Sequence, residues 1–338
     1  MSKIQTFLRR MDMGSLRRMQ RNIDTVHRES GKAKAAIFCD MVNCMLFKGF
    51  GHLDYLTFGF VYNKGAKRDT FMTMNDNIAL VQQLNDRAYY HVFNNKLDFN
   101  KTFTPFLGRT YIDLHDGFDA FAAFVGKNPV FFAKRAESFG GEGVKKVTVA
   151  TGTDLQTLYA SLIDDNFTLA EEAIRQHPEM NKLCDRSVNT IRIVTVVADD
   201  GTPRHVYSLV RVGSGKNDVD NISSGGMYTL LDENGRINFP MFCDKTVSYY
   251  DKHPQNGFVF KGFQIPYYKE AVDLCLKAAL VEPHMRYIGW DVAITPDGPA
   301  LVEGNNLPGY DMCQNHRFHA DGMGMKPAFA AALKNSDK

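Results

Sequence analysis

The segment GWDVAITPDGPALVEGNNLPG, residues 289–309, is the best-formed hairpin pattern in this sequence and the strongest constraint on its fold. Residues 290–294 and 299–303 are rich in apolar and β-branched side chains, which favour strands. The tripeptide Pro-Asp-Gly at 296–298 is a turn signal. The segment therefore predicts two antiparallel strands joined by a tight turn.

Two acids and one amide interrupt this otherwise apolar hairpin. With Asp297 as the centre of the turn, Asp291 and Glu303 face each other with Cβ atoms roughly 5 Å apart, where like charges repel. Asn305 follows Glu303 by two residues and projects from the same face. A hard divalent cation such as Mg²⁺ would turn that repulsion into attraction. Two interpretations stay open: a metal site, or an exposed hairpin whose acids face water.

Length and composition are typical of a soluble globular protein with two or three lobes. The chain has 338 residues, of which 44% are hydrophobic and 23% charged. A net charge of +2 argues against nucleic acid as a partner, and no apolar run reaches the roughly 18 residues that span a bilayer. Six scattered cysteines match neither a disulfide framework nor a zinc motif, and they predict reduced thiols in the cytoplasm.

Positive charge is concentrated in residues 1–35, which carry nine Lys or Arg against three acids. Apolar residues at helical spacing predict a helix pair with a solvated basic face. A basic arm that attracts an anionic substrate or a membrane surface is the alternative. Beyond it we expect a mainly helical region to residue 90, an α+β region over 91–180, and strands alternating with turns over 181–338 before a final helix.

A glycine loop follows a lysine that ends an apolar strand. The lysine is Lys134, and the loop glycines are Gly140, Gly141 and Gly143. Glycine lets backbone N–H groups close around phosphate oxygens, whose charge a lysine neutralises. The loop is not a P-loop, since Gly-Lys-Ser/Thr is missing. It is not a dinucleotide-binding fingerprint either, since a strand rather than a helix is expected to follow. A hairpin over a nucleotide and a plain flexible hairpin both stay open.

Charged residues also lie within three further predicted strands. The short strand at 169–174 carries Glu171 and Glu172, of which an inward acid could bind the exocyclic amine of adenine; two exposed acids at a domain edge are the alternative. Arg192 and Arg211 lie in apolar strands. An inward arginine needs a partner, and phosphate or carboxylate fits its fork best, whereas an outward one would face water.

The order of these parts resembles the ATP-grasp superfamily over about residues 91–310, and Glu303-Gly304-Asn305 after an Asp-bearing strand is its most specific element. VNTIRIVT, DNISSGG and the hairpin segment resemble, more narrowly, the sugar-transfer-associated ATP-grasp family. That family is linked to extracellular polysaccharide biosynthesis and is similar to enzymes proposed to attach amino acids to teichuronic acid polymers. The resemblance implies an α+β ATP-grasp fold, in which two α+β lobes sandwich MgATP behind a mainly helical, basic N-terminal region.

The resemblance also implies residue roles, matched by position. The implied nucleotide-binding residues are Lys96, Lys134, Gly140, Gly141, Gly143, Glu171, Glu172 and Ile174. The implied ligands of two Mg²⁺ ions, for which Mn²⁺ could substitute, are Asp291, Glu303 and Asn305. Arg192 and Arg211 would stabilise the transferred phosphoryl group. The first 90 residues do not match the small α/β domain of many relatives, and Glu179 is only a weak candidate for the ribose-binding acid.

The implied activity is that of an ATP-dependent carboxylate–amine ligase that forms an amide through an acyl phosphate. In that organisation residues 91–180 form the lobe with the glycine loop and adenine hinge, and 181–338 the lobe with the metal site. The substrates would be small-molecule or glycan-linked carboxylates and amines, and a homodimer is compatible with the sequence. A kinase acting on a hydroxyl or a sugar acid is the first alternative, because it needs the same ATP apparatus. A nucleotide-binding scaffold without activity is the second.

Overall fold

The structure, a computed structural model, describes residues 13–137, 143–215 and 225–335. The chain forms two compact units. Among the described residues the first contains 13–80 and 309–331, and the second contains 81–308 and 332–335. The predicted boundaries at residues 90 and 180 follow the order of the motifs. The two compact units instead divide near residues 80 and 308. The second division arises because the chain returns to its first unit after the hairpin.

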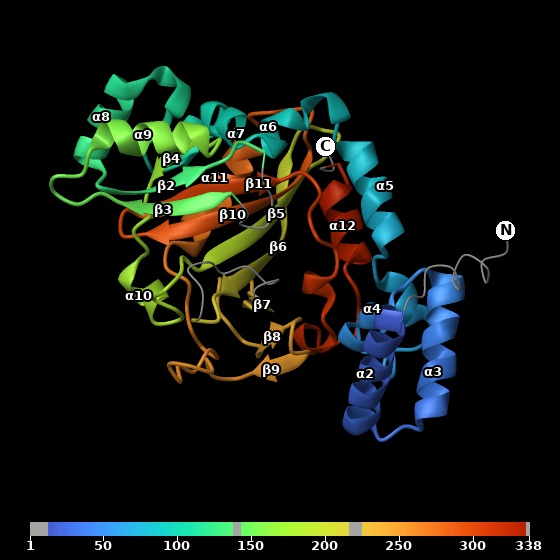
Figure 1. Ribbon diagram of the computed structural model, residues 1–338. Helices are drawn as coiled ribbons and strands as arrows, with labels where there is room; N and C mark the ends of the chain where they lie inside the picture. The colour runs from blue at the N-terminus through green and yellow to red at the C-terminus, as the bar shows by residue number, and fades with distance from the viewer. Residues whose placement is uncertain (1–12, 138–142, 216–224, 336–338) are drawn as a thin grey trace. The chain divides into compact units, whose positions relative to one another are not determined.

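The first unit is helical, as the sequence predicts. Its helices, two of which end in the second unit, are α2 (Met13–Ser30), α3 (Lys34–Asn43), α4 (His52–Thr57), α5 (Met74–Leu84) and α12 (Lys326–Leu333) (Figure 1). Its core contains Phe58, Phe60 and Phe71, fully buried rings whose centroids lie 5.1 to 5.7 Å apart. Such contacts between aromatic rings add to the stability gained from burial alone.

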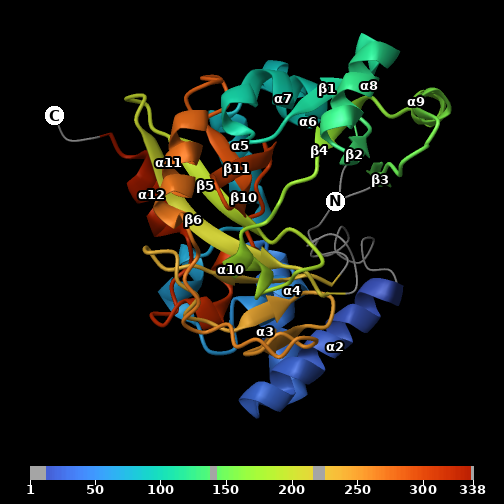
Figure 2. The ribbon, with the colours of Figure 1, turned by 90° about the vertical axis from the view of Figure 1, so that its left-hand side faces the viewer.

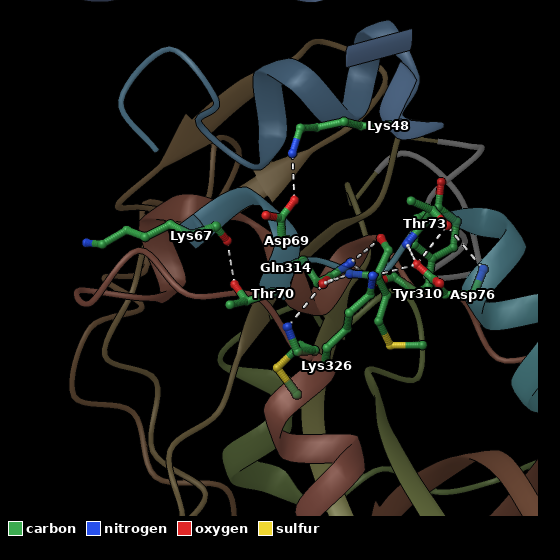
Figure 3. A network of polar contacts seen from close by, with 11 residues as sticks. Lys48, Lys67, Asp69, Thr70, Thr73, Asp76, Tyr310, Gln314 and Lys326 are labelled. Atoms are coloured by element: carbon green, nitrogen blue, oxygen red, sulfur yellow. Dashed lines mark hydrogen bonds and ion pairs between the residues drawn. The ribbon is translucent and has the colours of Figure 1, made fainter. Parts of the chain in front are cut away.

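One buried glutamine joins the two chain segments of the first unit (Figure 3). The Gln314 side chain accepts hydrogen bonds from the backbone N–H groups of Met72 (2.7 Å) and Met325 (3.1 Å), and donates one to the Met72 carbonyl (3.0 Å). Nearby, Lys326 forms an ion pair with Asp76 at 3.0 Å. Because a buried amide must have its hydrogen bonds satisfied, Gln314 specifies where the returning chain docks.

The second unit is built around a seven-stranded antiparallel sheet in the order β11-β10-β5-β6-β7-β8-β9. Its strands are β5 (Thr190–Val197), β6 (Pro203–Val212), β7 (Met227–Leu230), β8 (Met241–Cys243), β9 (Ser248–Tyr250), β10 (Tyr287–Thr295) and β11 (Gly298–Asn305). β5 is buried along its whole length, and β10 up to its last residue, so side chains of both faces are covered. Helices α6 (His91–Asn94), α7 (Lys96–Phe103) and α11 (Tyr268–Ala278) contribute to the same core.

A smaller antiparallel sheet, in the order β1-β4-β2-β3, belongs to the same unit. Its strands are β1 (Tyr111–Asp113), β2 (Val130–Lys134), β3 (Val144–Thr148) and β4 (Leu169–Glu172). Helices α8 (Phe118–Lys127) and α9 (Leu155–Asp164) supply apolar side chains to its core. Figure 2 shows these strands and helices grouped apart from β5 and β6. A short helix, α10 (Pro178–Asn181), follows β4.

The predicted α+β class and the strands that carry the motifs are confirmed. β2 and β3 flank the glycine loop, β5 and β6 carry the two arginines, and α9 and α11 are the predicted amphipathic helices. All six cysteines are unpaired thiols, five of them buried. No helix in the described parts of the chain is long and apolar enough to cross a membrane.

Candidate active site

The hairpin of β10 and β11 places Asp291 directly opposite Glu303, as predicted. The predicted turn centre is wrong, however. A two-residue turn pairs Thr295 with Gly298, a register that by itself would align Asp291 with Val302. A β-bulge beside Asp291 shifts the register by one residue and brings Glu303 into place. The facing acids thus depend on one extra residue in the edge strand.

The Asp291 carboxylate is buried and held by two arginines from neighbouring strands. Arg192 lies directly across from it on β5, and its Nε and Nη2 donate to Oδ1 and Oδ2 at 2.5 and 2.9 Å. Arg211 on β6 adds an ion pair from Nη1 to Oδ2 at 3.2 Å. Burial alone would raise the pKa of Asp291, but these two guanidinium groups outweigh it and hold the pKa well below its usual range. Both predicted arginines therefore point inward, and both have a carboxylate partner.

Glu303 has the opposite electrostatic character. Loss of solvation raises its pKa, and the neighbouring Asp291 raises it further by charge repulsion and as a hydrogen-bond partner, whereas Arg192 and Arg211 act in the opposite direction. The side chain is nevertheless accessible to solvent. Glu303 therefore keeps its proton to a higher pH than an ordinary glutamate, and a cation bound by both carboxyl groups would compete with that proton.

The donor set of the hairpin suits a hard cation. Asn305 is half-buried, and its Nδ2 donates to the Gly289 carbonyl across the hairpin at 3.3 Å, so its oxygen is the atom that could bind a metal. Asp291 and Glu303 supply carboxylate oxygens. Within the described ranges no three His, Cys, Asp or Glu side chains gather as a metal site. Two carboxylates and one amide fit Mg²⁺, which commonly takes one or two carboxylates and completes its shell with water and substrate phosphates.

A second buried charge cluster lies in the smaller sheet. Glu171 accepts from Lys134 Nζ at 2.6 Å, from Arg109 Nε at 2.9 Å and from Asn100 Nδ2 at 2.7 Å. Burial would raise the pKa of Glu171, but the two cations outweigh it and hold the pKa well below its usual range. Because its carboxylate is enclosed by protein donors, this arrangement does not favour the predicted contact with adenine. Glu171 instead fixes the ammonium group of Lys134.

Lys96 connects the two clusters. It begins α7, and its backbone N–H donates to the Ala136 carbonyl, just beyond β2, at 3.0 Å. Burial lowers the pKa of its ammonium group, as does Lys134, whereas Glu303 and Glu171 raise it. These mutual effects indicate that Lys96 lies within electrostatic range of the hairpin acid and of the charged groups of the smaller sheet. Of the predicted metal ligands, Glu303 is the one that affects Lys96, and Lys134 affects Lys96 from the smaller sheet.

Other predicted residues of the nucleotide site lie nearby in the chain. Gly140 and Gly141 fall outside the described residues. Gly143 has φ +70°, and its carbonyl accepts from the Arg135 N–H at 3.0 Å, which closes the base of the loop between β2 and β3. A left-handed conformation of this kind suits glycine. The role of the loop in phosphate binding stays a prediction.

Glu172, at the end of β4, and Glu179, after it, both have protein partners. Glu172 accepts from both the backbone N–H (3.0 Å) and the hydroxyl (2.9 Å) of Thr110. Ile174 is half-buried in the following loop, where its backbone could still face a base. Glu179 is exposed and forms a local ion pair with Lys182 at 2.7 Å. The adenine and ribose contacts therefore stay predictions.

Arg109 and Asn100 escape sequence reasoning although both contact Glu171. Apart from the carbonyl of Leu107, the groups that accept hydrogen bonds from Arg109 belong to residues 62 to 193 positions later in the sequence. The sequence offers one local signal, the preceding Gly108, a residue type that is common in turns. Such a signal marks a turn and says nothing about a partner so distant.

Comparison with known proteins gives one family. A model described as "Sugar-transfer associated ATP-grasp" matches residues 75–327. Among curated proteins none matches the chain significantly.

Three solved structures illustrate what this chain is similar to. N5-carboxyaminoimidazole synthetase from Staphylococcus aureus, complexed with ADP, is 12% identical over 65% of this chain and 46% of its own, with a TM-score of 0.42. D-alanine-D-alanine ligase from Coxiella burnetii is 10% identical over 72% and 56%, with a TM-score of 0.41. The ATP-grasp ligase PsnB, complexed with a variant of its minimal precursor, Mg and ADP, is 14% identical over 74% and 62%, with a TM-score of 0.43. The chain thus spans about half to three fifths of their lengths.

Proposed function

Because this chain belongs to the sugar-transfer associated ATP-grasp family, we propose that it is an ATP-dependent ligase that joins a carboxylate to an amine. The predicted family and fold are confirmed by the match over residues 75–327. One observation supports the activity most: Asp291 and Glu303 face each other across the hairpin, with the pKa of Glu303 raised. Two opposed carboxyl groups, one of them paired with Arg192 and Arg211, are an arrangement that a divalent cation stabilises.

When bound, MgATP would supply the γ-phosphoryl group: its transfer to the substrate carboxylate would give an acyl phosphate and ADP, and attack by the amine would then give the amide and inorganic phosphate. Asp291, Glu303 and Asn305 would hold the metal. Lys96 and Lys134 lie where they can neutralise phosphate charge, since both belong to the same electrostatic cluster as Glu303. Positioning and charge neutralisation dominate phosphoryl transfer, so no nucleophile from the protein is required.

The contacts of Arg192 and Arg211 with Asp291 support a different role for each arginine. Arg192 uses its fork on Asp291, so it acts as a positioning residue for a metal ligand. Arg211 contacts Asp291 through one Nη atom, at 3.2 Å, and approaches the same oxygen as Arg192. We assign to Arg211 the stabilisation of the phosphoryl group, with Asp291 holding its guanidinium in place.

The family description supports a substrate connected with sugars. We propose a sugar acid or an amino acid used in polysaccharide or related biosynthesis, free or linked to a glycan. Six unpaired thiols suit a reducing compartment, and on that basis we propose the cytoplasm.

ADP release with Mg²⁺, pooled sugar acids and pooled amino acids tests the proposal. A ligase releases inorganic phosphate only when both an acid and an amine are present, and mass spectrometry then finds an amide. A kinase leaves a stable phosphorylated product without amine. Absence of nucleotide binding, measured directly with the non-hydrolysable analogue AMP-PNP, would refute both activities.

A further inference from the structure

Arg109 links the smaller sheet to the strand that carries Glu303. Its side chain is buried, with 2% of its surface exposed. Nε donates to Glu171 at 2.9 Å, whereas Nη1 donates to the carbonyl of Leu301 at 2.5 Å and Nη2 to that of Val302 at 3.3 Å. One guanidinium group therefore contacts both sheets of the second unit.

The two carbonyls belong to the β-bulge that determines the register of Glu303. Leu301 is the last residue paired before the register shift, and Val302 is the extra residue. A bulge interrupts the ladder of hydrogen bonds, and buried carbonyls need donors from elsewhere. β11 is also an edge strand, so no further strand can supply them. Arg109 fills this need with two donors at a fixed separation.

Close backbone packing fixes the position from which Arg109 reaches the bulge. Gly108 adopts φ +58°, and a Cβ placed on it would lie 2.9 Å from the Cβ of Ala300 in β11. Only glycine allows this approach without strain. Nη1 of Arg109 also donates to the Leu107 carbonyl at 3.2 Å, which holds the guanidinium against its own loop.

The other end of the linkage reaches the nucleotide lysine. The Glu171 Oε2 atom that accepts from Arg109 also accepts from Lys134 Nζ, at 2.6 Å. Moving the Arg109 guanidinium would therefore disturb both the bulge beneath Glu303 and the carboxylate that orients Lys134.

We propose that Arg109 is a positioning residue that holds the metal ligand Glu303 and the phosphate-binding Lys134 in a fixed relation to each other. This inference rests on the proposed MgATP site. A lysine keeps the charge but has a single ammonium group, so it cannot contact Glu171 and both carbonyls in the same planar geometry. Groups that orient metal ligands typically contribute 10- to 100-fold to metal affinity.

The test is a titration of Mn²⁺ into the full-length protein with AMP-PNP, with free Mn²⁺ followed by electron paramagnetic resonance. Arg109→Lys should weaken Mn²⁺ binding roughly tenfold or more. Arg286→Lys is the matched control, because Arg286 also donates to a backbone carbonyl (Val197, 2.9 Å) and a carboxylate (Asp199, 2.6 Å) but touches no predicted site residue. Its Mn²⁺ affinity should equal that of the wild type. Equal affinities in all three proteins would overturn the inference.

Glu171→Gln is the second variant, in case Arg109→Lys does not fold. It keeps the size of the side chain but removes the charge that orients Arg109 and Lys134. We expect Mn²⁺ binding to weaken several-fold although Glu171 contacts none of the three predicted metal ligands, and unchanged affinity would overturn the linkage. A wild type that binds neither AMP-PNP nor Mn²⁺ would instead refute the proposed function, and the inference with it.

Discussion

Asp291 and Glu303 face each other across the β10–β11 hairpin because β11 contains one residue more than the turn register requires. The pair is electrostatically unequal. The pKa of Asp291 lies well below its usual range because of two arginines, while that of Glu303 is raised by loss of solvation and by Asp291. A cation bound by both carboxyl groups would compete with the proton on Glu303 and reduce the repulsion between the two acids, and the first two predictions follow from this.

Glu303→Gln should abolish most Mg²⁺-dependent ADP release and should not destabilise the metal-free protein at neutral pH. The raised pKa of Glu303 means that its contribution to stability is present below the ordinary glutamate pKa of 4.5 and is lost as the pH rises through the folded-state pKa. The melting temperature of the variant relative to wild type should therefore increase with pH above this value. Thermal melting in the absence of metal between pH 4 and 8 measures it. A difference independent of pH would show that Glu303 is not coupled to Asp291.

Binding of the metal–nucleotide complex should release a proton at pH values where Glu303 is still protonated. Because the ion competes with that proton, Mg²⁺ affinity in the presence of AMP-PNP should increase with pH and level off once Glu303 is ionised. Calorimetry in buffers of different ionisation enthalpy counts the protons. Glu303→Gln should remove this dependence, and a wild-type affinity that does not vary with pH would contradict the coupled pair.

Substitution of Arg192 should mainly lower stability, whereas substitution of Arg211 should mainly lower kcat. Arg192→Met removes the bidentate partner of a fully buried carboxylate, so it should cost about 3 kcal/mol of unfolding free energy. Adding Asp291→Asn should recover part of that loss, because the uncompensated charge disappears. Denaturant unfolding of the two single variants and the double variant measures the coupling, and strict additivity would argue against the pair.

Arg211→Lys should lower kcat more than it raises the KM for ATP, since the charge stays while the planar fork is lost. Arg211→Ala should cost on the order of 10²-fold in kcat. Steady-state kinetics, corrected for the folded fraction, measure both. A large drop in melting temperature with kcat preserved would identify Arg211 as a structural partner of Asp291 only.

Gly304→Ala should damage the metal site from the opposite face of β11. A Cβ at this position would lie 2.8 Å from the ring of Phe93 and 3.0 Å from that of Phe99. Overpacking of this kind typically costs about 1–3 kcal/mol and would displace the flanking Glu303 and Asn305. Phe93→Leu should partly restore both the melting temperature and Mn²⁺ binding. Failure of this rescue would show that Phe93 does not limit the space at this position.

Local features of the sequence determine much of this protein. Apolar, β-branched segments bounded by turn signals predict β10, β11 and the strands around the glycine loop, and apolar residues at helical spacing predict α9 and α11; the structure contains all of them. These signals depend on neighbours a few residues apart, so they are readable without the fold. The order of the motifs likewise suffices for the family, which the match over residues 75–327 confirms.

The tertiary structure alone decides which charges become partners. The turn register would align Asp291 with Val302, and only the bulge, with Arg109 on its carbonyls, makes Glu303 the facing residue. The local sequence shows only that Glu171 lies in a strand beside Glu172. In the structure its carboxylate is enclosed by Asn100, Arg109 and Lys134, which come from three other segments. Gln314 joins its partner Met72 across 242 residues. Such contacts depend on how distant segments pack, and no local propensity or spacing encodes the partner of a buried charge.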